Sequence, residues 1–285
     1  MNYINLSLVI ASHKGSKKLI NLLNSIILGK SIPKEIVIVC STDEYNKYIF
    51  NLKKFNKIFN IIILKSKIKN QIYQRQIGLA KARNDYILQL DDDLTLDKNT
   101  IKLLYENVNK SHFKKIFCLN LIDKNKNPLD SRWSYYYRHY TSFKIALYFL
   151  NGYKKIQPNT IIKSGRPIPS FKKNYRYEWL NSSLCFHKNA MKDYKFFDTV
   201  GKAYYEDIFT SHSFLVQGYE LKKITNSILI HPKTNQIDFN EHLKAFQNQK
   251  IIVKTFKKNI ILLYFDFLIF SLFFIQKKIK NKFIL

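Results

Sequence analysis

Three aspartates in a row, Asp91, Asp92 and Asp93, follow directly after the apolar stretch DYILQL at residues 85–90. Neighbouring carboxylates repel one another, and burying one of them without a partner is unfavourable. Two carboxylates one residue apart, such as Asp91 and Asp93, can hold a hard divalent cation that takes its remaining ligands from water and a bound diphosphate. The pattern therefore indicates metal-assisted chemistry on a phosphorylated substrate, although Asp-rich runs also cap helices or lie in solvated loops.

The chain carries far more positive than negative charge, with 48 Lys and Arg against 20 Asp and Glu and a formal net charge of +28. Such a surplus favours a partner rich in phosphate, which could be nucleic acid, anionic lipid or a phosphorylated substrate. It also fits compositional drift on solvated faces, because the sequence is rich in Ile, Asn, Lys, Tyr and Phe and poor in Gly and Pro. Its 46% apolar residues exclude general disorder.

Three cysteines, Cys40, Cys118 and Cys185, each stand in or beside an apolar run, and none forms a CxxC pair. This predicts small buried core residues in a reducing compartment rather than disulfides or zinc ligands. The opening stretch MNYINLSLVIASHKG has neither a basic leader nor a cleavage site, so we expect a cytoplasmic protein.

Apolar strand and helix patterns alternate along the first half of the chain. The predicted strands are residues 4–12, 35–41, 60–66, 85–90 and 115–122, and the predicted helices are residues 16–30, 70–84 and 98–109. Nearly continuous apolar strands separated by helices predict an α/β fold with a mainly parallel sheet that is covered on both faces. In such sheets ligands bind outside the carboxyl ends of the strands, which is where Asp91–Asp93 falls.

The second half of the chain has a different sequence pattern. Residues 131–155 are dense in aromatic and basic side chains, which suits a nucleic-acid surface, an insertion that contacts an acceptor or a membrane, or a helix packed on the core. Residues 178–191 predict a strand with a polar entry loop, and residues 203–224 predict a helix, a Gly turn and a further strand. That helix begins with Glu206 and Asp207. Their structural interpretation is that acidic side chains in a first helical turn interact favourably with the helix dipole.

The C-terminal segment, residues 259–276, is apolar around most of its circumference but is interrupted by Asp266 and flanked by lysines. Spanning a bilayer takes about 20 apolar residues, and this stretch is shorter and contains a carboxylate. We therefore expect a helix that lies in the headgroup region or docks on the domain, with its lysines reaching anionic lipid. A membrane span is the second interpretation.

Three motifs, in this order and at these separations, resemble the family 2 glycosyltransferases, inverting enzymes of the GT-A fold that use nucleotide-sugars. LVIASHKG is similar to the opening strand and loop of that family, and QRQIGLAKARNDYILQLDDDLTL to its Arg-Asn helix and Asp-x-Asp strand end. YYEDIFTSHSFLVQGYEL is similar to its Glu-Asp helix and the strand that follows. The resemblance covers roughly residues 4–232.

The resemblance implies a role for each matching residue. Asp207 would be the general base that deprotonates the acceptor hydroxyl, and Asp93 would be the main ligand of Mn²⁺ or Mg²⁺. The remaining contacts would be Ala11, Ser12, Asp43, Arg75, Asp91 and Asp92 to the nucleotide-sugar, Trp179, Asn181 and Glu206 to the acceptor, and Asp91 and His231 to the metal. His231 can equally be a structural histidine.

These roles place different demands on the carboxylates. Asp207 would have to be partly desolvated so that its pKa rises toward the working pH. The sequence departs from the family pattern after the second strand, where Cys40 replaces the first residue of an Asp pair that reads the base. Asp43, three residues later, is the candidate substitute.

The resemblance implies a catalytic domain over residues 1–235, with a nucleotide-sugar part at about 1–125 and an acceptor part at about 126–235. Residues 236–285 would form a helical tail that associates with the membrane. We expect a glycosyltransferase at the inner face of the bacterial cytoplasmic membrane, acting on a glycan or lipid-linked acceptor such as lipopolysaccharide or capsule.

Other functions make different use of the same residues. Nucleotidyl or phosphoryl transfer also uses paired carboxylates, but it calls for a glycine-rich phosphate loop, which the seven glycines do not form. A basic nucleic-acid-binding protein would use residues 131–155 and would leave both acidic pairs unexplained. An inactive glycosyltransferase-like scaffold would fit the departure at Cys40. With the enzyme favoured, no nucleic acid is expected as a partner.

Overall fold

The structure of the chain is a computed structural model. It describes residues 2–14, 16–124, 160–161, 167–168, 179–199, 202–232, 239–265, 267–268, 271–272 and 275. The aromatic and basic segment at 131–155 lies outside the described residues, as do Asp266 and the lysines from Lys277 onward.

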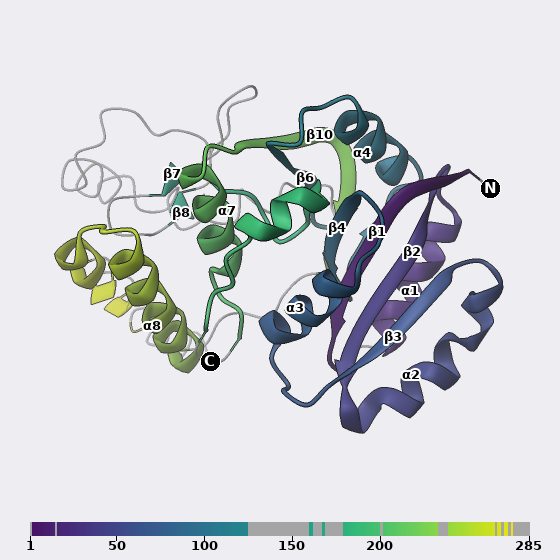
Figure 1. The fold of residues 1–285 in the computed structure, drawn as a ribbon. Helices are drawn as coiled ribbons and strands as arrows, with labels where there is room; N and C mark the ends of the chain where they lie inside the picture. The colour runs from purple at the N-terminus through teal and green to yellow at the C-terminus, as the bar shows by residue number, and fades with distance from the viewer. Residues whose placement is uncertain are drawn as a thin grey trace.

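The described residues form a mixed eight-stranded sheet in the order β3-β2-β1-β4-β9-β6-β10-β5 (Figure 1). Its strands are β1 (Tyr3–Ser12), β2 (Ile32–Ser41), β3 (Asn60–Ser66), β4 (Tyr86–Asp91), β5 (Thr95–Leu96), β6 (Lys115–Ile122), β9 (Leu184–His187) and β10 (Glu220–Ile230). Strands β1 to β4 are parallel neighbours, whereas β9 runs antiparallel between β4 and β6. A small hairpin pairs β7 (Thr160–Ile161) with β8 (Pro167–Ile168).

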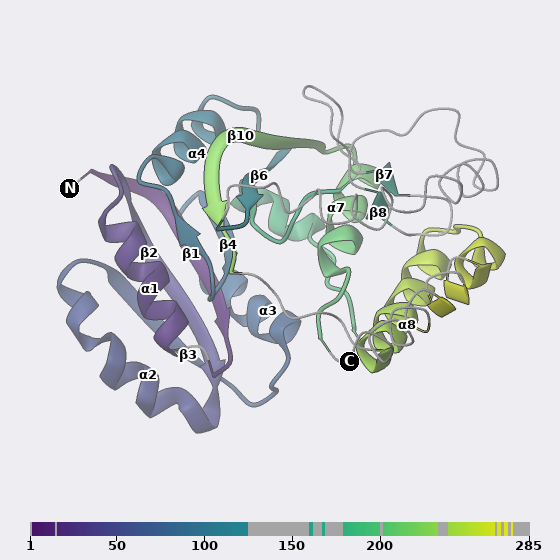
Figure 2. The ribbon, with the colours of Figure 1, turned by 180° about the vertical axis from the view of Figure 1, so that it is seen from behind.

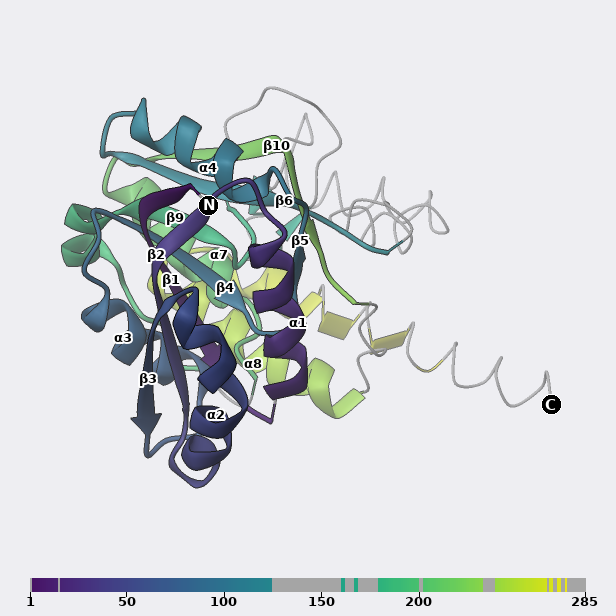
Figure 3. The ribbon, with the colours of Figure 1, turned by 90° about the vertical axis from the view of Figure 1, so that its right-hand side faces the viewer.

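Helices cover both faces of this sheet (Figure 2). One face carries α1 (Ser16–Ile27), α2 (Tyr45–Leu52) and α4 (Thr100–Asn109), whose apolar side chains share a core with alternate residues of β1, β2 and β4. The other face carries α3 (Gln71–Lys81) and α7 (Glu206–Val216), which pack on the intervening residues of the same strands. The side view of Figure 3 shows α1 and α3 on opposite sides of β1.

Helix α3 approaches the sheet closely at Gly78. A Cβ added at this glycine would lie 2.6 Å from Val9 Cγ1 and 3.1 Å from Val39 Cγ2. These are stiff β-branched side chains on two neighbouring strands, so they have little freedom to move aside. The glycine therefore sets how closely α3 packs against β1 and β2.

The C-terminal part of the chain folds back onto the domain. Helix α8 (Phe239–Thr255) lies beside α7 (Figure 1), and a further helical stretch at 260–265 packs on α8 through a cluster of Phe246, Val253 and Leu263. The opposite side of that stretch is exposed. Among the described residues from 261 to 275, the exposed apolar side chains are Ile261, Tyr264, Phe265, Leu268, Leu272 and Ile275, and Ile261 is 74% exposed. Within the described part of the chain, no helix is both long enough and apolar enough to cross a bilayer.

The predicted strands at 60–66 and 115–122 match β3 and β6, and the α/β fold with a mainly parallel sheet covered by helices on both faces is confirmed, with β5 and β9 as its antiparallel strands. Helix α2 was not predicted, because its eight residues carry a short apolar pattern with no capping signal before it. The helix predicted at 70–84 ends at Lys81, since the chain must turn there to enter β4.

Candidate active site

Arg75 of α3 lies at the centre of the candidate site. It is 2% exposed, and its guanidinium forms ion pairs with Asp91 at the end of β4 and with Glu206 at the start of α7. Asn70 caps α3 by accepting hydrogen bonds from the backbone N–H groups of Ile72 and Tyr73, which fixes the start of the helix. Burial opposes the charge of Arg75, but Glu206 and Asp91 outweigh it and raise its pKa. One cation thus joins two carboxylates that lie 115 residues apart, at positions 91 and 206.

Asp91 makes its contacts to other protein side chains. Besides Arg75, it accepts hydrogen bonds from Gln71 Nε2 at 2.8 Å and from Ser182 Oγ at 2.9 Å. The register of the sheet places Ala11 of β1 directly beside it. The structure therefore makes Asp91 the junction between β4, α3 and the loop before β9.

Asp92 faces the end of β1. Its carboxylate accepts a hydrogen bond from Ser12 Oγ, which in turn lies 2.6 Å from Tyr48 Oη of α2. Burial raises the pKa of Asp92 to about 6, and the charges of Asp93 and Asp91 add to this effect. Two residues predicted to contact the nucleotide-sugar, Ser12 and Asp92, are thus brought together.

Asp93 and His231 meet although they come from different strand ends. His231 Nε2 lies 3.7 Å from Asp93 Oδ1, and Lys18 Nζ of α1 lies 3.5 Å from Asp93 Oδ2. His231 Nδ1 is 2.5 Å from the carbonyl of Pro232, so donating its proton there would leave Nε2 free to bind a metal. The donor pair fits the divalent cation that the resemblance implies.

The pair does not make a complete metal site. Among the residues that the structure describes, no group of three or more His, Cys, Asp or Glu side chains could hold a metal ion. A cation bound by Asp93 and His231 would therefore need water and the donor diphosphate for its other positions, which is the usual habit of Mg²⁺ in phosphate sites.

The region predicted to read the base contains two carboxylates. Asp43 is half exposed and pairs with Lys69 at 2.8 Å, a hydrogen bond that lowers the pKa of Asp43 to about 2. Glu44 is less exposed, and its Oε2 accepts hydrogen bonds from the backbone N–H of Lys14 at 2.9 Å and from Ser41 Oγ at 3.1 Å. Cys40 is fully buried in β2, where its thiol packs in the core. Glu44 thus joins the ends of β1 and β2, and the sequence had not singled it out.

Asp207 follows Glu206 in the first turn of α7 and is partly buried. Burial raises its pKa to about 7, a hydrogen bond from the backbone N–H of Ile208 at 3.0 Å opposes this, and the charge of Glu206 adds to it. The residue before this pair, Tyr205, has φ of 66°, a left-handed conformation that non-glycine residues rarely adopt. Such strain often occurs at functional sites.

Two of the predicted acceptor residues, Trp179 and Asn181, lie just before β9, whereas the third, Glu206, is buried at the start of α7 and pairs with Arg75. Trp179 is buried among Ile72, Ile208 and other apolar side chains, and its Nε1 has no hydrogen-bond partner among the described residues. Asn181 donates to the carbonyl of Leu119 at 2.9 Å and accepts from the backbone N–H of Ser183, so its amide orders this loop.

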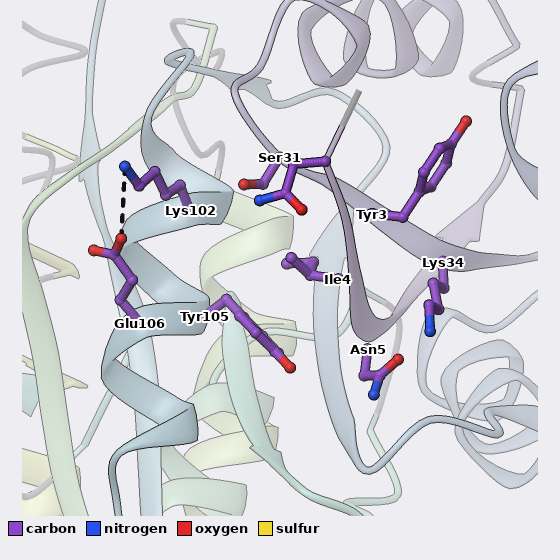
Figure 4. Close-up of a pocket in the computed structure, with 9 residues that line it drawn as sticks. Tyr3, Ile4, Asn5, Ser31, Lys34, Lys102, Tyr105 and Glu106 are labelled. Atoms are coloured by element: carbon purple, nitrogen blue, oxygen red, sulfur yellow. Dashed lines mark ion pairs between the residues drawn. The ribbon is translucent and has the colours of Figure 1, made fainter.

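A separate cavity of about 330 Å³ opens at the other end of β1 (Figure 4). Tyr3, Asn5, Lys34 and Tyr105 contribute to its wall. A ten-residue strand is about 33 Å long, so this cavity lies far from Ser12 and is not part of the candidate site.

The structure adds residues that the sequence did not identify: Lys18, Glu44, Tyr48, Gln71 and Ser182. Some local signals were present. Gln71 follows the helix cap Asn70, and Ser182 stands in the polar entry loop before β9. The others are positioned by contacts between distant segments, which no local pattern reveals.

Comparison with known proteins shows the family and the fold. The model of the family described as glycosyl transferase family 2 matches residues 7–201. No curated protein matches the chain. The solved structure of GalNAc-T7 with UDP, GalNAc and Mn²⁺ is similar, with a TM-score of 0.59 and 14% identity over 81% of this chain and 43% of that one.

A second similar structure is S. aureus TarS 1-349 in complex with UDP-GlcNAc, with a TM-score of 0.57 and 13% identity over 89% of this chain and 66% of that chain. This chain thus spans less than half of the GalNAc-T7 chain, at 43%. At such identities the likeness shows the fold alone. The predicted GT-A fold is confirmed by these neighbours, and the match over most of its length shows that the chain belongs to glycosyl transferase family 2.

Proposed function

We propose that this protein is an inverting glycosyltransferase that moves a sugar from a nucleotide-sugar to an acceptor hydroxyl with the help of Mn²⁺ or Mg²⁺. The observation that carries the proposal is the connected set of carboxylates at the candidate site. Asp207, whose pKa is raised to about 7, is adjacent to Glu206, and Arg75 joins Glu206 to the strand end that bears the aspartates. A base and a cation site would thus be held in one rigid arrangement.

In the proposed reaction, the acceptor oxygen attacks the anomeric carbon from the face opposite the leaving diphosphate. The bond between that carbon and the diphosphate oxygen breaks, the configuration inverts, and Asp207 accepts the hydroxyl proton. A raised pKa suits this role, because a base works best when its pKa is near the working pH. A cation at Asp93 and His231 would stabilise the charge that develops on the leaving diphosphate.

The choice of donor rests on the neighbours. GalNAc-T7 is described with UDP, and TarS with UDP-GlcNAc. We therefore infer a uridine diphosphate sugar as the first donor to test. Ser12, Asp92 and Tyr48 would line its nucleotide side, and Glu44, which is bonded to the backbone at the end of β1, would take the place of Asp43.

The exposed apolar side of residues 260–275 supports a lipid surface as a partner. Ile261, Leu268 and Leu272 are more than half exposed, and the sequence places lysines both before and after this segment. An amphipathic helix of this kind binds at the headgroup boundary, and basic residues strengthen its binding to anionic lipid. This location suits a lipid-linked acceptor of a surface glycan, such as lipopolysaccharide or capsule, at the inner face of the cytoplasmic membrane.

The membrane part of the proposal can be tested by sedimentation with vesicles that contain phosphatidylserine. Leu268→Glu should reduce the bound fraction of the full chain, because a charge would have to enter the apolar layer. Equal binding of the variant and the wild-type protein would contradict a lipid-facing role for this side of the helix.

The donor part calls for calorimetric titration of UDP, GDP, CDP and dTDP, each with and without Mn²⁺. One nucleotide should bind in a Mn²⁺-dependent manner, and Asp93→Ala should abolish this dependence. Asp85→Ala is the matched control, since Asp85 is an exposed aspartate just before the other end of β4. Undiminished binding to Asp93→Ala would contradict the metal role, and the absence of binding by every nucleotide would favour a scaffold or a nucleic-acid-binding protein.

A further inference from the structure

The turn that leads into the candidate base is held by a helix outside the matched part of the family model. The match ends at residue 201, whereas Asp207 and α8 follow it. Residues 202–205 form a tight turn in which the Tyr204 N–H donates to the carbonyl of Lys202 at 2.7 Å. Tyr205 then adopts its left-handed conformation, with φ of 66°. A turn of this kind persists where the surrounding structure holds it.

Polar contacts from α8 reach this turn directly. Asn248 is fully buried, and its Nδ2 donates to the carbonyls of Tyr204 at 3.2 Å and Lys202 at 3.4 Å. Two turns of helix earlier, Glu241 accepts a hydrogen bond from Tyr204 Oη and lies 3.6 Å from Lys202 Nζ. The backbone and the side chains of the turn are therefore both bound to α8.

Apolar contacts complete the attachment. Ile252 of α8 is fully buried in a cluster that includes Ile208 and Phe209 of α7, the two residues that follow Asp207. Just after α8, Phe256 packs on Phe209 with ring centroids 5.3 Å apart. The base is thus flanked by contacts on both sides in the sequence: the turn before it and the first helical turn after it.

We propose that Asn248 and the Tyr204–Glu241 pair are positioning residues that hold Asp207 in its reactive place. On the opposite side, the ion pair between Glu206 and Arg75 already fixes the start of α7 to the donor side. Helix α8 supplies the second attachment, so that the start of α7, which carries Asp207, is held at two points and cannot rotate around the ion pair. This inference rests on the proposed function, because it takes Asp207 as the base.

The expected effect is on turnover rather than on donor binding. Small displacements of a catalytic group that arise away from the chemistry can lower the rate by about 10²-fold. Asn248 donates to the backbone of the turn, whereas Ser12 and Asp92 bond to each other on the proposed donor side, so we expect the affinity for UDP to stay the same. A merely structural role would lower stability without separating kcat from the donor KM.

The test compares three variants of the full chain. Asn248→Leu removes the amide while keeping a similar volume, and Tyr204→Phe removes a single hydroxyl and should fold even if the first variant does not. Gln247→Leu is the matched control, since Gln247 is the exposed neighbour of Asn248 on the same helix. For each protein, we would measure Mn²⁺-dependent UDP binding by calorimetry, release of UDP from UDP-GlcNAc, and amide hydrogen exchange over residues 203–208.

Support would be faster exchange over 203–208 and a loss of kcat on the order of 10²-fold in Asn248→Leu, with a smaller loss in Tyr204→Phe and unchanged UDP binding in both. Exchange and turnover equal to those of Gln247→Leu would overturn the positioning role and leave the proposed function standing. A wild-type protein that neither binds UDP nor releases it from UDP-GlcNAc would overturn the proposed function, and the role of α8 in catalysis with it.

Discussion

The proposed donor side and the proposed acceptor side of the candidate site are built in different ways. On the donor side, Ser12, Asp91 and Asp92 stand at the ends of parallel strands whose register places them next to one another. On the proposed acceptor side, Asp207 stands in the first turn of α7, just after the turn at 202–205, and its surroundings come from α7, α8 and Trp179. The sheet positions the first set, whereas contacts between distant segments position the second.

This difference indicates where one side chain of the site can be changed without moving the others. A strand end is fixed by the hydrogen bonds of the whole ladder, so a single side chain there can change without moving its neighbours. A turn in a left-handed conformation has no such ladder and depends on each attachment. Arg75 is the exception, because it contacts both sides at once.

The largest effect is expected from Asp207→Asn, which should separate the two sides. General base catalysis contributes about 10²- to 10⁴-fold, so turnover should fall by that factor. UDP binding should remain, because the amide keeps the shape of the side chain and the donor side is untouched. Enzyme kinetics and calorimetry on the same preparation measure the two effects, with Asp198→Asn, a change at an exposed aspartate nine residues earlier in the chain, as the control. Near-normal transfer would rule out Asp207 as the base.

Arg75→Met should damage both sides together. The change leaves Asp91 and Glu206 without their shared cation, and removing one partner of a buried ion pair costs about 3–5 kcal/mol in the free energy of unfolding. Chemical denaturation measures this loss. Arg83→Met, which removes a largely exposed arginine from the same region, should lower stability far less. Equal stability of the two variants would show that the buried ion pairs do not tie the two sides together.

The two sides should also respond to pH at different points. Burial raises the pKa of Asp207 from 3.8 to about 7, so this carboxyl takes up a proton as the pH falls through 7 and can no longer act as a base. The value of kcat should therefore fall about tenfold for each pH unit below 7. Burial raises the pKa of Asp92 to about 6, so this carboxyl takes up its proton at a lower pH than Asp207 does. UDP binding should weaken as the pH falls through 6, because a neutral acid accepts hydrogen bonds less strongly than a carboxylate. A pH profile of kcat that stays flat down to pH 5 would contradict this assignment.

The same contrast explains what could be predicted from the sequence. The strands at 60–66 and 115–122 and the mainly parallel sheet follow from apolar runs and their spacing, and Asp91–Asp93 was located because it follows such a run. Glu44 and Tyr48 could not be found in this way, since they belong to short helical segments whose local pattern is weak. The attachment of Asn248 to the turn at 202–205 joins segments more than forty residues apart, and no local periodicity encodes such a contact.

The close approach at Gly78 has a consequence for Arg75, which lies three residues earlier on the same helix. A methyl group at position 78 would meet Val9 at 2.6 Å and push α3 outward from the sheet. The guanidinium would then be carried away from a strand end and a helix start that do not move with it. The guanidinium of Arg75 reaches both Asp91 and Glu206 because α3 packs this closely on the sheet. The absence of a side chain at position 78 therefore sets how far the guanidinium of Arg75 lies from the two carboxylates of the candidate site.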